Sequence, residues 1–313
     1  MFPLIHLFGR EISTYSIMAG LGILACYLAV VRPGLKRCKD LKGTTVVTLS
    51  LWAALGLFLG AHLLYGLTHA WKIGYAFTHL DKVFQSWDSF IAYGMDIFGG
   101  MVFYGGLIGA VIAAAIYLKA SKQDIAGYAD LLSPAIPLFH AFGRIGCFLG
   151  GCCYGVESPF GFVYTNSLAP EANGVSRFPV QLVEAAANFL LAICMLWLFH
   201  KKKLKKGRLI LVYGLSYPVI RFILEFWRGD QIRGIFFGLS TSQWISLAVF
   251  AISAVIALWD FTRNRKIKKA VHLVLFPSMV IILYVPSPAG TNFHCCPFPP
   301  FPVHWMILVP SSS

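Results

Sequence analysis

Seven long apolar stretches constrain this chain more than any other feature of its sequence. A helix needs about 20 apolar residues to cross the hydrocarbon core of a bilayer, and it satisfies every backbone polar group within the segment. Only 12% of the residues are charged, whereas a soluble domain carries about 25%. The sequence therefore predicts an all-α polytopic membrane protein with about seven transmembrane helices. The predicted spans are roughly 14–31, 44–67, 96–118, 128–150, 179–200, 209–227 and 238–260.

The basic residues predict the orientation of these spans. Most of the 26 lysines and arginines lie in four clusters, at 32–42, 119–122, 201–208 and 263–269. These clusters follow the first, third, fifth and seventh spans, so they all fall on one side of the membrane. Because cytoplasmic connections carry an excess of lysine and arginine, we expect the amino terminus outside and the carboxyl terminus in the cytoplasm.

The same distribution of charge argues against nucleic acid as a partner. A formal net charge of +13 is compatible with nucleic-acid binding, which typically uses a continuous basic patch. Here the basic residues form short clusters between apolar stretches, which is a topology pattern. The eight cysteines form no C-x-x-C pair and no zinc-like spacing with histidines. We expect no metal and no cofactor.

The spans and connections predict a membrane domain over residues 1–262 and a tail over 263–313. Two of the predicted external connections are long, about 68–95 and 151–178, and the first is rich in aromatic residues, as is typical of a segment at the headgroup level. The tail is basic, then apolar and proline-rich, and we expect it to be poorly ordered. Its apolar run at 271–285 leaves an eighth, partial span open.

A glycine-rich motif, FGGMVFYGGLIGA at 98–110, falls in the third predicted span. Gly105 and Gly109 form a G-x-x-x-G, which is typical of closely packed membrane helices. The glycine pairs at 99–100 and 105–106 exceed what one packing face needs. They also favour a second interpretation, in which the helix is loosened beside Tyr104 and its backbone approaches a ligand.

A second motif, HAFGRIGCFLGGCCYG at 140–155, places Arg144 in an apolar span. An arginine at the bilayer centre costs about 2.5–3.5 kcal/mol on insertion scales, so it should face a polar cavity and hold an anion. An ion pair with an acidic residue elsewhere is the alternative. Acidic residues are scarce within the spans, which favours the anion. His140 lies one helical turn away and is interpreted as a packing residue.

A third motif, YGLSYPVIRFILEFWRGD at 213–230, predicts a polar stripe along an apolar helix. At 100° per residue, one face carries Tyr217, Arg221, Glu225 and Arg228. Arg221 and Glu225 are spaced to neutralise each other, which would leave Arg144 and Arg228 unmatched. An excess of buried positive charge points to an anionic ligand, and the planar fork of arginine suits phosphate.

A weaker element, RFPVQLVEA at 177–185, places Arg177, Gln181 and Glu184 at the start of the fifth span. Helix-start chemistry explains Pro179 alone. A role for the polar residues in a site stays open at this point.

Together, these four segments resemble the prolipoprotein diacylglyceryl transferase family. GGMVFYGGLIGA is similar to its glycine-rich segment, GRIGCFLGGCCYG to its G-R-x-x-x-F signature, RFPVQLVEA to its P-x-Q-L-x-E-A stretch, and YPVIRFILEFWRGD to its tyrosine–arginine–glutamate helix. The resemblance runs from about residue 14 to 262. Many members carry a histidine where this sequence has Tyr104 and an asparagine where it has Cys147.

The resemblance implies an enzyme of the bacterial inner membrane. It would move the diacylglyceryl group of phosphatidylglycerol onto the lipobox cysteine of a preprolipoprotein signal peptide and release glycerol phosphate. Membrane lipid would surround the enzyme. Residues 1–262 would then be the transmembrane catalytic domain. Arg144 and Arg221 are the expected catalytic residues, with Tyr104 adding a hydrogen bond. The expected substrate-binding residues are Arg144, Tyr217, Glu225, Arg228, Gly105, Gly106 and Gln181.

Two other classes of membrane protein are weighed against this interpretation. A transporter or channel for an anionic solute would also place arginines within the membrane, but the two halves show no internal repeat, which transporters commonly have. A thiol-redox or metal protein built on Cys147, Cys152 and Cys153 is the other alternative. Adjacent cysteines suit neither a tetrahedral metal site nor a dithiol switch well.

Overall fold

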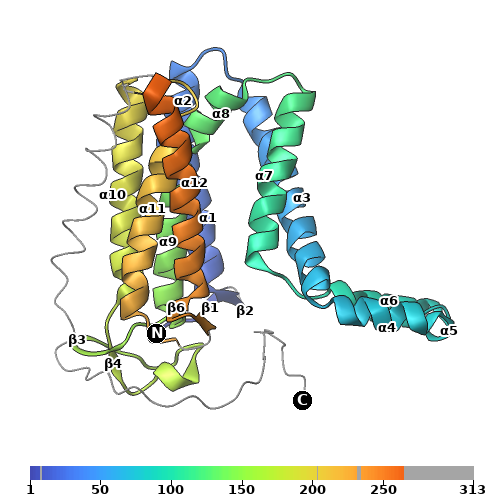
Figure 1. Cartoon of the computed structure of the whole chain (residues 1–313). Helices are drawn as coiled ribbons and strands as arrows, with labels where there is room; N and C mark the ends of the chain where they lie inside the picture. Colours follow the sequence, from blue (N-terminus) through green and yellow to red (C-terminus); the bar gives the residue numbers. More distant parts are fainter. Residues whose placement is uncertain (8, 203, 231–233, 264–313) are drawn as a thin grey trace. The chain divides into compact units, whose positions relative to one another are not determined.

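The computed structural model describes residues 1–7, 9–202, 204–230 and 234–263 (Figure 1). Over these residues, seven helices are long and apolar enough to cross a membrane, which confirms the predicted class of an all-α multi-pass membrane protein. The seven are Thr14–Arg37, Gly43–Thr68, Phe103–Ala120, Ile125–Gly150, Val180–His200, Leu209–Trp227 and Thr241–Asp260.

Several of these spans are composite. The first contains α1 (Thr14–Cys26), a π-helical turn (Tyr27–Val31) and α2 (Arg32–Arg37). The fourth contains α8 (Ile125–Leu132) and α9 (Ala135–Gly150), and the sixth contains α11 (Leu209–Leu224) and a 3₁₀ turn (Glu225–Trp227). The other spans are single helices: α3 (Gly43–Thr68), α7 (Phe103–Ala120), α10 (Val180–His200) and α12 (Thr241–Arg263).

In the part of the chain that the structure describes, the strands are short and form three antiparallel pairs. A hairpin of β1 (Leu4–Leu7) and β2 (Arg10–Ser13) precedes α1. In the segment between α9 and α10, β3 (Glu157–Val163) pairs with β4 (Ser176–Arg177), and a 3₁₀ turn (Pro170–Ala172) lies between them. Before α12, β5 (Ile235–Phe236) pairs with β6 (Leu239–Ser240).

The chain divides into two compact units, which are described separately. Among the described residues, the first unit holds Met1–Cys38 and the chain from Ala126 to Arg263, and the second holds Lys39–Ile125. Both lie almost entirely within the domain predicted over 1–262. Residues 264–313 of the predicted tail, with the apolar run at 271–285, lie outside the described residues.

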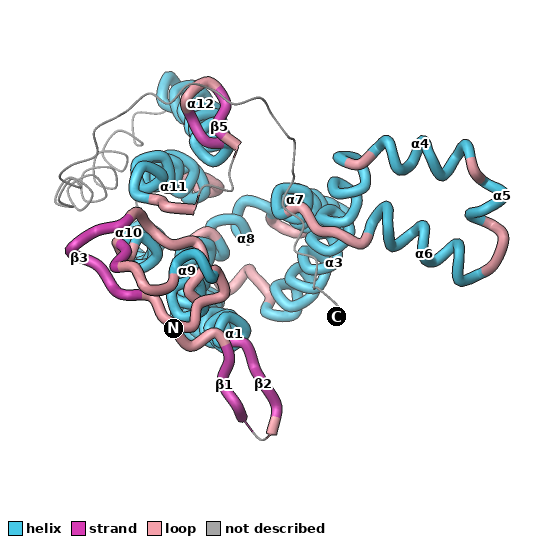
Figure 2. The backbone as a smooth tube through the Cα atoms, turned by 90° about the horizontal axis from the view of Figure 1, so that it is seen from below, coloured by secondary structure: helices cyan, strands magenta, loops and turns pink. Residues whose placement is uncertain are grey.

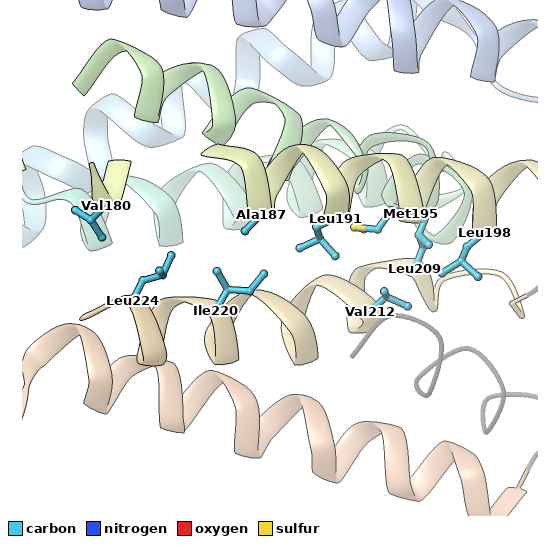
Figure 3. Close-up of a cluster of buried hydrophobic side chains, with 9 residues drawn as sticks. All are labelled: Val180, Ala187, Leu191, Met195, Leu198, Leu209, Val212, Ile220 and Leu224. Atoms are coloured by element: carbon cyan, nitrogen blue, oxygen red, sulfur yellow. The ribbon is translucent and has the colours of Figure 1, made fainter. Parts of the chain in front are cut away.

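The first unit is a helical bundle in which α1, α9, α10, α11 and α12 pack successively against one another (Figure 2). Its main apolar core lies between α10 and α11, whose side chains face one another along both helices (Figure 3). In lipid such an interface is held by van der Waals packing rather than by the hydrophobic effect. The core consists of Val180, Ala187, Leu191, Met195, Leu198, Leu209, Val212, Ile220 and Leu224.

In the second unit, α3 and α7 cross at glycines. A Cβ atom on Gly60 would lie 2.2 Å from the backbone oxygen of Gly105, and one on Gly109 would lie 2.1 Å from that of Gly56. Because neither helix has side chains at these points, the two backbones come into direct contact. The G-x-x-x-G of Gly105 and Gly109 is therefore a packing face, as one of the two interpretations of the motif expected.

The start of the third span differs from the prediction. The helix α7 begins at Phe103 and not near 96, so Gly99 and Gly100 lie outside it. Glycine disfavours helix, and a Cβ atom on Gly100 would lie 2.2 Å from the ring of Tyr65. The glycine pair thus ends the preceding helix α6 (Trp87–Phe98) and lets the chain turn closely against α3.

The connection predicted over 68–95 is helical. It forms α4 (Ala70–Thr78), α5 (Leu80–Val83) and α6, with α4 and α6 side by side (Figure 2). Its aromatic side chains are exposed, with Trp71, Phe77, Phe84 and Trp87 between 67% and 74% accessible. Large aromatic rings with this much exposed surface fit the predicted position at the headgroup level.

The glycine crossing yields a prediction about stability. We expect Gly109→Val to lower the free energy of unfolding by about 1–3 kcal/mol, because the added side chain overlaps backbone that cannot move aside. Gly20→Val in α1 is the matched control, since a Cβ atom there meets no described residue within 4 Å. Thermal unfolding of both variants in one detergent measures the difference. Equal melting temperatures would contradict the crossing.

Candidate functional site

A buried glutamate organises the polar centre of the first unit. Glu184 lies on α10 with only 1% of its surface exposed. Arg144 of α9 brings its Nε to 3.0 Å from Glu184 Oε2, and Tyr217 of α11 donates a hydrogen bond of 3.3 Å to Oε1. His140 of α9 completes the group, with Nε2 at 3.5 Å from Oε1. Three helices therefore converge on one carboxylate.

The pattern of α10 explains why Glu184 is buried. Gln181, Glu184 and Asn188 recur at helical spacing and are all at most 1% exposed, so they form a polar stripe on the inner face of this apolar helix. Buried polar groups persist where they have partners. Here Asn188 donates to the backbone oxygen of Glu184 at 2.9 Å, and Gln181 donates to Cys152 O at 2.8 Å.

The expectation that Arg144 has no acidic partner is therefore wrong. The partner, Glu184, lies on another helix and belongs to RFPVQLVEA at 177–185, the weakest of the four motifs. His140 was also misinterpreted as a packing residue, because its Nε2 accepts a hydrogen bond of 3.2 Å from Arg144 Nε. The i, i+4 spacing of these two residues on α9 is the signal that could have indicated it.

Arg221 and Glu225 form the ion pair that their spacing indicates. Arg221 Nη2 lies 2.6 Å from Glu225 Oε2 and donates a second hydrogen bond of 3.1 Å to Ser242 Oγ at the start of α12. Arg221 is buried, at 7% exposure. Its Nη1 is buried and meets no hydrogen-bond acceptor among the described residues.

Arg228 is placed differently from the prediction. The α-helix ends at Leu224, and after the 3₁₀ turn Arg228 is extended, so it does not continue the face of Tyr217 and Arg221 on a regular helix. It is also not unmatched, because its Nε and Nη2 donate to the two carboxylate oxygens of Asp230 at 2.9 and 2.8 Å. Burial alone would lower the pKa of Arg228, but the bonds to Asp230 outweigh it and the pKa is raised.

The charges of this centre are balanced, which corrects the expected excess of positive charge. Arg144, Arg221 and Arg228 face Glu184, Glu225 and Asp230 in turn. Some of its buried polar atoms nevertheless lack a hydrogen-bond partner over the described residues, among them Glu184 Oε2 and two guanidinium nitrogens. Arg221 Nη1 and Arg228 Nη1 are both buried without an acceptor in the described part of the chain. A buried donor left unpaired costs about 1–3 kcal/mol, and an anionic oxygen would satisfy it.

The segment between α9 and α10 is fixed to the end of α11. Val156 N donates to Trp227 O, and Gly229 N donates to Tyr154 O, both at 3.0 Å. A Cβ atom on Gly155 would lie 2.2 Å from the backbone oxygen of Phe178 and 3.0 Å from that of Trp227, so glycine is required where the segment passes between them. The segment thus holds the backbone on both sides of Arg228.

Gln181 and Arg177 fasten the same segment from within. The Gln181 amide exchanges hydrogen bonds with the Tyr164 hydroxyl at 3.0 and 3.2 Å. Arg177 stacks on the ring of Tyr154 at 4.4 Å and donates to the backbone oxygens of Glu171 and Ala172. Burial raises the pKa of Tyr164, which keeps this hydroxyl neutral. These contacts give both residues a structural role, and the predicted substrate contact of Gln181 stays a prediction.

The glycine-rich motif lies in the second unit. Tyr104 is in the first turn of α7 and 38% exposed, while Gly105 and Gly106 are buried against α3. Among the predicted site residues, the structure therefore groups Arg144, Tyr217, Arg221, Glu225, Arg228 and Gln181 in the first unit. The roles predicted for Tyr104, Gly105 and Gly106 stay predictions.

The helices and this centre define a multi-pass membrane protein with a buried cluster of arginines and carboxylates. The family model for prolipoprotein diacylglyceryl transferase matches residues 3–259. The chain therefore belongs to the prolipoprotein diacylglyceryl transferase family.

Curated relatives agree with this assignment. The phosphatidylglycerol–prolipoprotein diacylglyceryl transferase of Clostridium tetani is 35% identical over 265 residues, which cover 84% of this chain and 98% of the relative. Enzyme 2 of that name from Clostridium perfringens is 34% identical over 266 residues, covering 83% and 94%. The Helicobacter pylori enzyme from strain 26695 is 35% identical over 222 residues, covering 70% and 77%.

Proposed function

We propose that this protein transfers the diacylglyceryl group of phosphatidylglycerol to the cysteine thiol of a prolipoprotein. The similarity of most of the chain to relatives that carry this activity in their names is the observation that supports it. The acceptor is the lipobox cysteine of the signal peptide, and the membrane is the bacterial inner membrane. This function is consistent with a centre whose unpaired guanidinium donors suit a phosphate.

The reaction is a displacement at carbon. The thiol sulfur forms a bond to the carbon of the diacylated glycerol that bears the phosphate ester. The bond between this carbon and the phosphate-ester oxygen breaks. The electron pair leaves with glycerol phosphate, and the thiol proton passes to a base. Because negative charge develops on the leaving phosphate, donors fixed around it lower the barrier. The nucleophile comes from the prolipoprotein, so the reaction needs no cysteine of this chain.

We assign the headgroup phosphate to Arg144 and Arg221, with Arg228 beside it. Over the described residues, Arg221 Nη1 and Arg228 Nη1 are buried donors of this centre without acceptors, and Arg144 contacts Glu184 and His140 through its Nε. In this assignment Glu184 and Glu225 hold the guanidinium groups in place, and Tyr217 supports Glu184.

The second unit would contribute through its glycine-rich helix. We propose that Tyr104, whose ring is partly accessible at the start of α7, donates a hydrogen bond to the substrate. In the same proposal, Gly105 and Gly106 of the same turn of α7 would let the helix backbone approach the substrate.

Orientation is a further part of the proposal, with the amino terminus outside and α12 ending in the cytoplasm. A reporter inserted in the basic connection 201–208 should therefore be cytoplasmic, and one in the connection 151–178 should be external. Paired phosphatase and fluorescent-protein fusions at each position measure this. The opposite result at either site would overturn the orientation.

A transporter for an anionic solute is the competing class, and a cell-free assay separates the two. The purified protein in detergent is mixed with phosphatidylglycerol labelled in its headgroup and with a lipobox peptide. An enzyme releases labelled glycerol phosphate only when the peptide is present, whereas a transporter releases none because detergent abolishes any gradient. Peptide-independent or absent release would contradict the proposed function.

A further inference from the structure

Three cysteine sulfurs gather beside the arginine cluster. Cys147 lies in the last turn of α9, and Cys152 and Cys153 follow just after the helix. Their three Sγ atoms lie within 4.8 Å of one another, and each residue is half-buried. No step of the proposed reaction uses them.

The backbone conformation after α9 brings these three sulfurs together. The helix α9 ends at Gly150, and Gly151 turns the chain with a φ of +75°. Cys153 has a φ of +57°, which is rare for a residue other than glycine, asparagine or aspartate and costs free energy. Cys152 is held by its backbone, since its N–H donates to Cys147 O at 3.1 Å and its oxygen accepts from Gln181 at 2.8 Å.

This turn explains how the adjacent cysteines Cys152 and Cys153 can share one ion, which their sequence argues against. Adjacent cysteines normally point to opposite sides of an extended chain and cannot share an ion. With Cys153 in the left-handed region, both neighbouring sulfurs instead approach Cys147. If three sulfurs surround one ion in a plane at metal–sulfur distances of about 2.3 Å, the sulfurs lie about 4 Å from one another. This separation is compatible with the three Sγ atoms, which lie within 4.8 Å of one another.

We propose that Cys147, Cys152 and Cys153 bind one monovalent thiophilic cation, namely Cu(I), as a trigonal tris-sulfur site. Thiolate ligands select Cu(I) and Zn(II) among biological metals. Zn(II) takes four ligands and completes a three-residue site with water, and over the described residues no histidine, aspartate or glutamate joins this group of three to form a closed zinc site. Cu(I) is satisfied by three. On binding, the ion replaces thiol protons that pass to solvent, and no group is oxidised or reduced.

Nearby charge supports the site. Three thiolates and one Cu(I) carry a net negative charge, which must be compensated away from bulk water. The guanidinium groups of Arg228 and Arg144 favour the thiolate of Cys153, and each is at the same time paired with a carboxylate, of Asp230 and Glu184. Arg144 also stands one helical turn before Cys147 on α9, so the two side chains share a face of that helix.

Titration of the full-length, reduced protein with Cu(I), against a chromogenic Cu(I) chelator and without oxygen, tests the proposal. We expect one equivalent to bind with thiolate-to-copper absorption in the ultraviolet. Cys147→Ser and Cys153→Ser should each weaken binding at least about tenfold, because each removes a direct ligand. The matched controls are Cys38→Ser and the double variant Cys295→Ser/Cys296→Ser, which should bind as the unsubstituted protein does.

Two results would overturn the site. One is unchanged binding in both Cys147→Ser and Cys153→Ser, and the other is loss of binding in the double variant of Cys295 and Cys296. X-ray absorption of the copper-loaded, unsubstituted protein gives an answer even if a variant fails to fold. Three sulfur neighbours support the proposal, and nitrogen or oxygen neighbours, or fewer sulfurs, contradict it.

Discussion

Replacement of Arg144 by lysine should lower diacylglyceryl transfer about 100-fold or more while the protein keeps its level in the membrane. A lysine retains the positive charge that Glu184 needs, so the buried carboxylate is not left alone. It loses the planar guanidinium fork, which suits a phosphate, whereas the contacts with Glu184 and His140 are made through Nε. Removal of one donor to a developing oxyanion costs about 100-fold to 1,000-fold in rate.

The matched control is Arg208→Lys. Arg208 stands just before α11 and pairs with the buried carboxylate of Asp260 at 2.8 Å, so the same change is made at a partner of a buried carboxylate outside the proposed site. Transfer rates at equal protein level, with melting temperatures in detergent, compare the two variants. If Arg144→Lys turned over as fast as Arg208→Lys, the phosphate would not be bound by Arg144.

Arg221→Ala should reduce transfer below about 1% of normal, and the second substitution Glu225→Ala should not restore it. In the proposed site Glu225 orients Arg221, whose Nη1 stays available for the lipid phosphate. Glu225→Ala alone should lower activity less, since Ser242 still accepts a hydrogen bond from Arg221. Protein level should be largely kept in all three variants.

A purely structural ion pair would give a different pattern. Each single variant would then lose about 3–5 kcal/mol, because one buried charge remains without its partner. Removal of both charges would restore the yield and the activity. The four-way comparison of transfer rate and melting temperature distinguishes these outcomes. Recovery of transfer in the double variant would remove Arg221 from the site and leave Arg144 as the headgroup anchor.

Hydropathy predicted the spans well because a membrane helix is specified by its own residues. Six of the seven predicted ranges lie within a few residues of the helices found over the described chain. The third starts later than predicted, because the apolar stretch around Gly99 and Gly100 continues in composition but not in helix. Composition also predicted a connection over 68–95, whereas the structure has short amphipathic helices there.

The sequence indicated the three arginines and Glu225, the acidic partner of Arg221, but not the acidic partners of Arg144 and Arg228. Arg144 and Arg221 stand out in sequence because each interrupts an apolar span. Glu184 pairs with an arginine on another helix, and single-helix periodicity does not show which faces of two helices meet. Asp230 was missed because the helix was assumed to continue past Leu224, although it ends there and Arg228 pairs with Asp230 two residues further on.

The mass of a lipobox peptide after incubation with the purified protein and phosphatidylglycerol tests the central proposal most directly. We expect the peptide to gain the mass of one diacylglyceryl group on its cysteine, and a peptide with serine at that position to gain nothing. The gain should disappear with Arg221→Ala and persist with Arg208→Lys. An unmodified cysteine peptide, under conditions in which the C. tetani relative modifies it, would contradict the account.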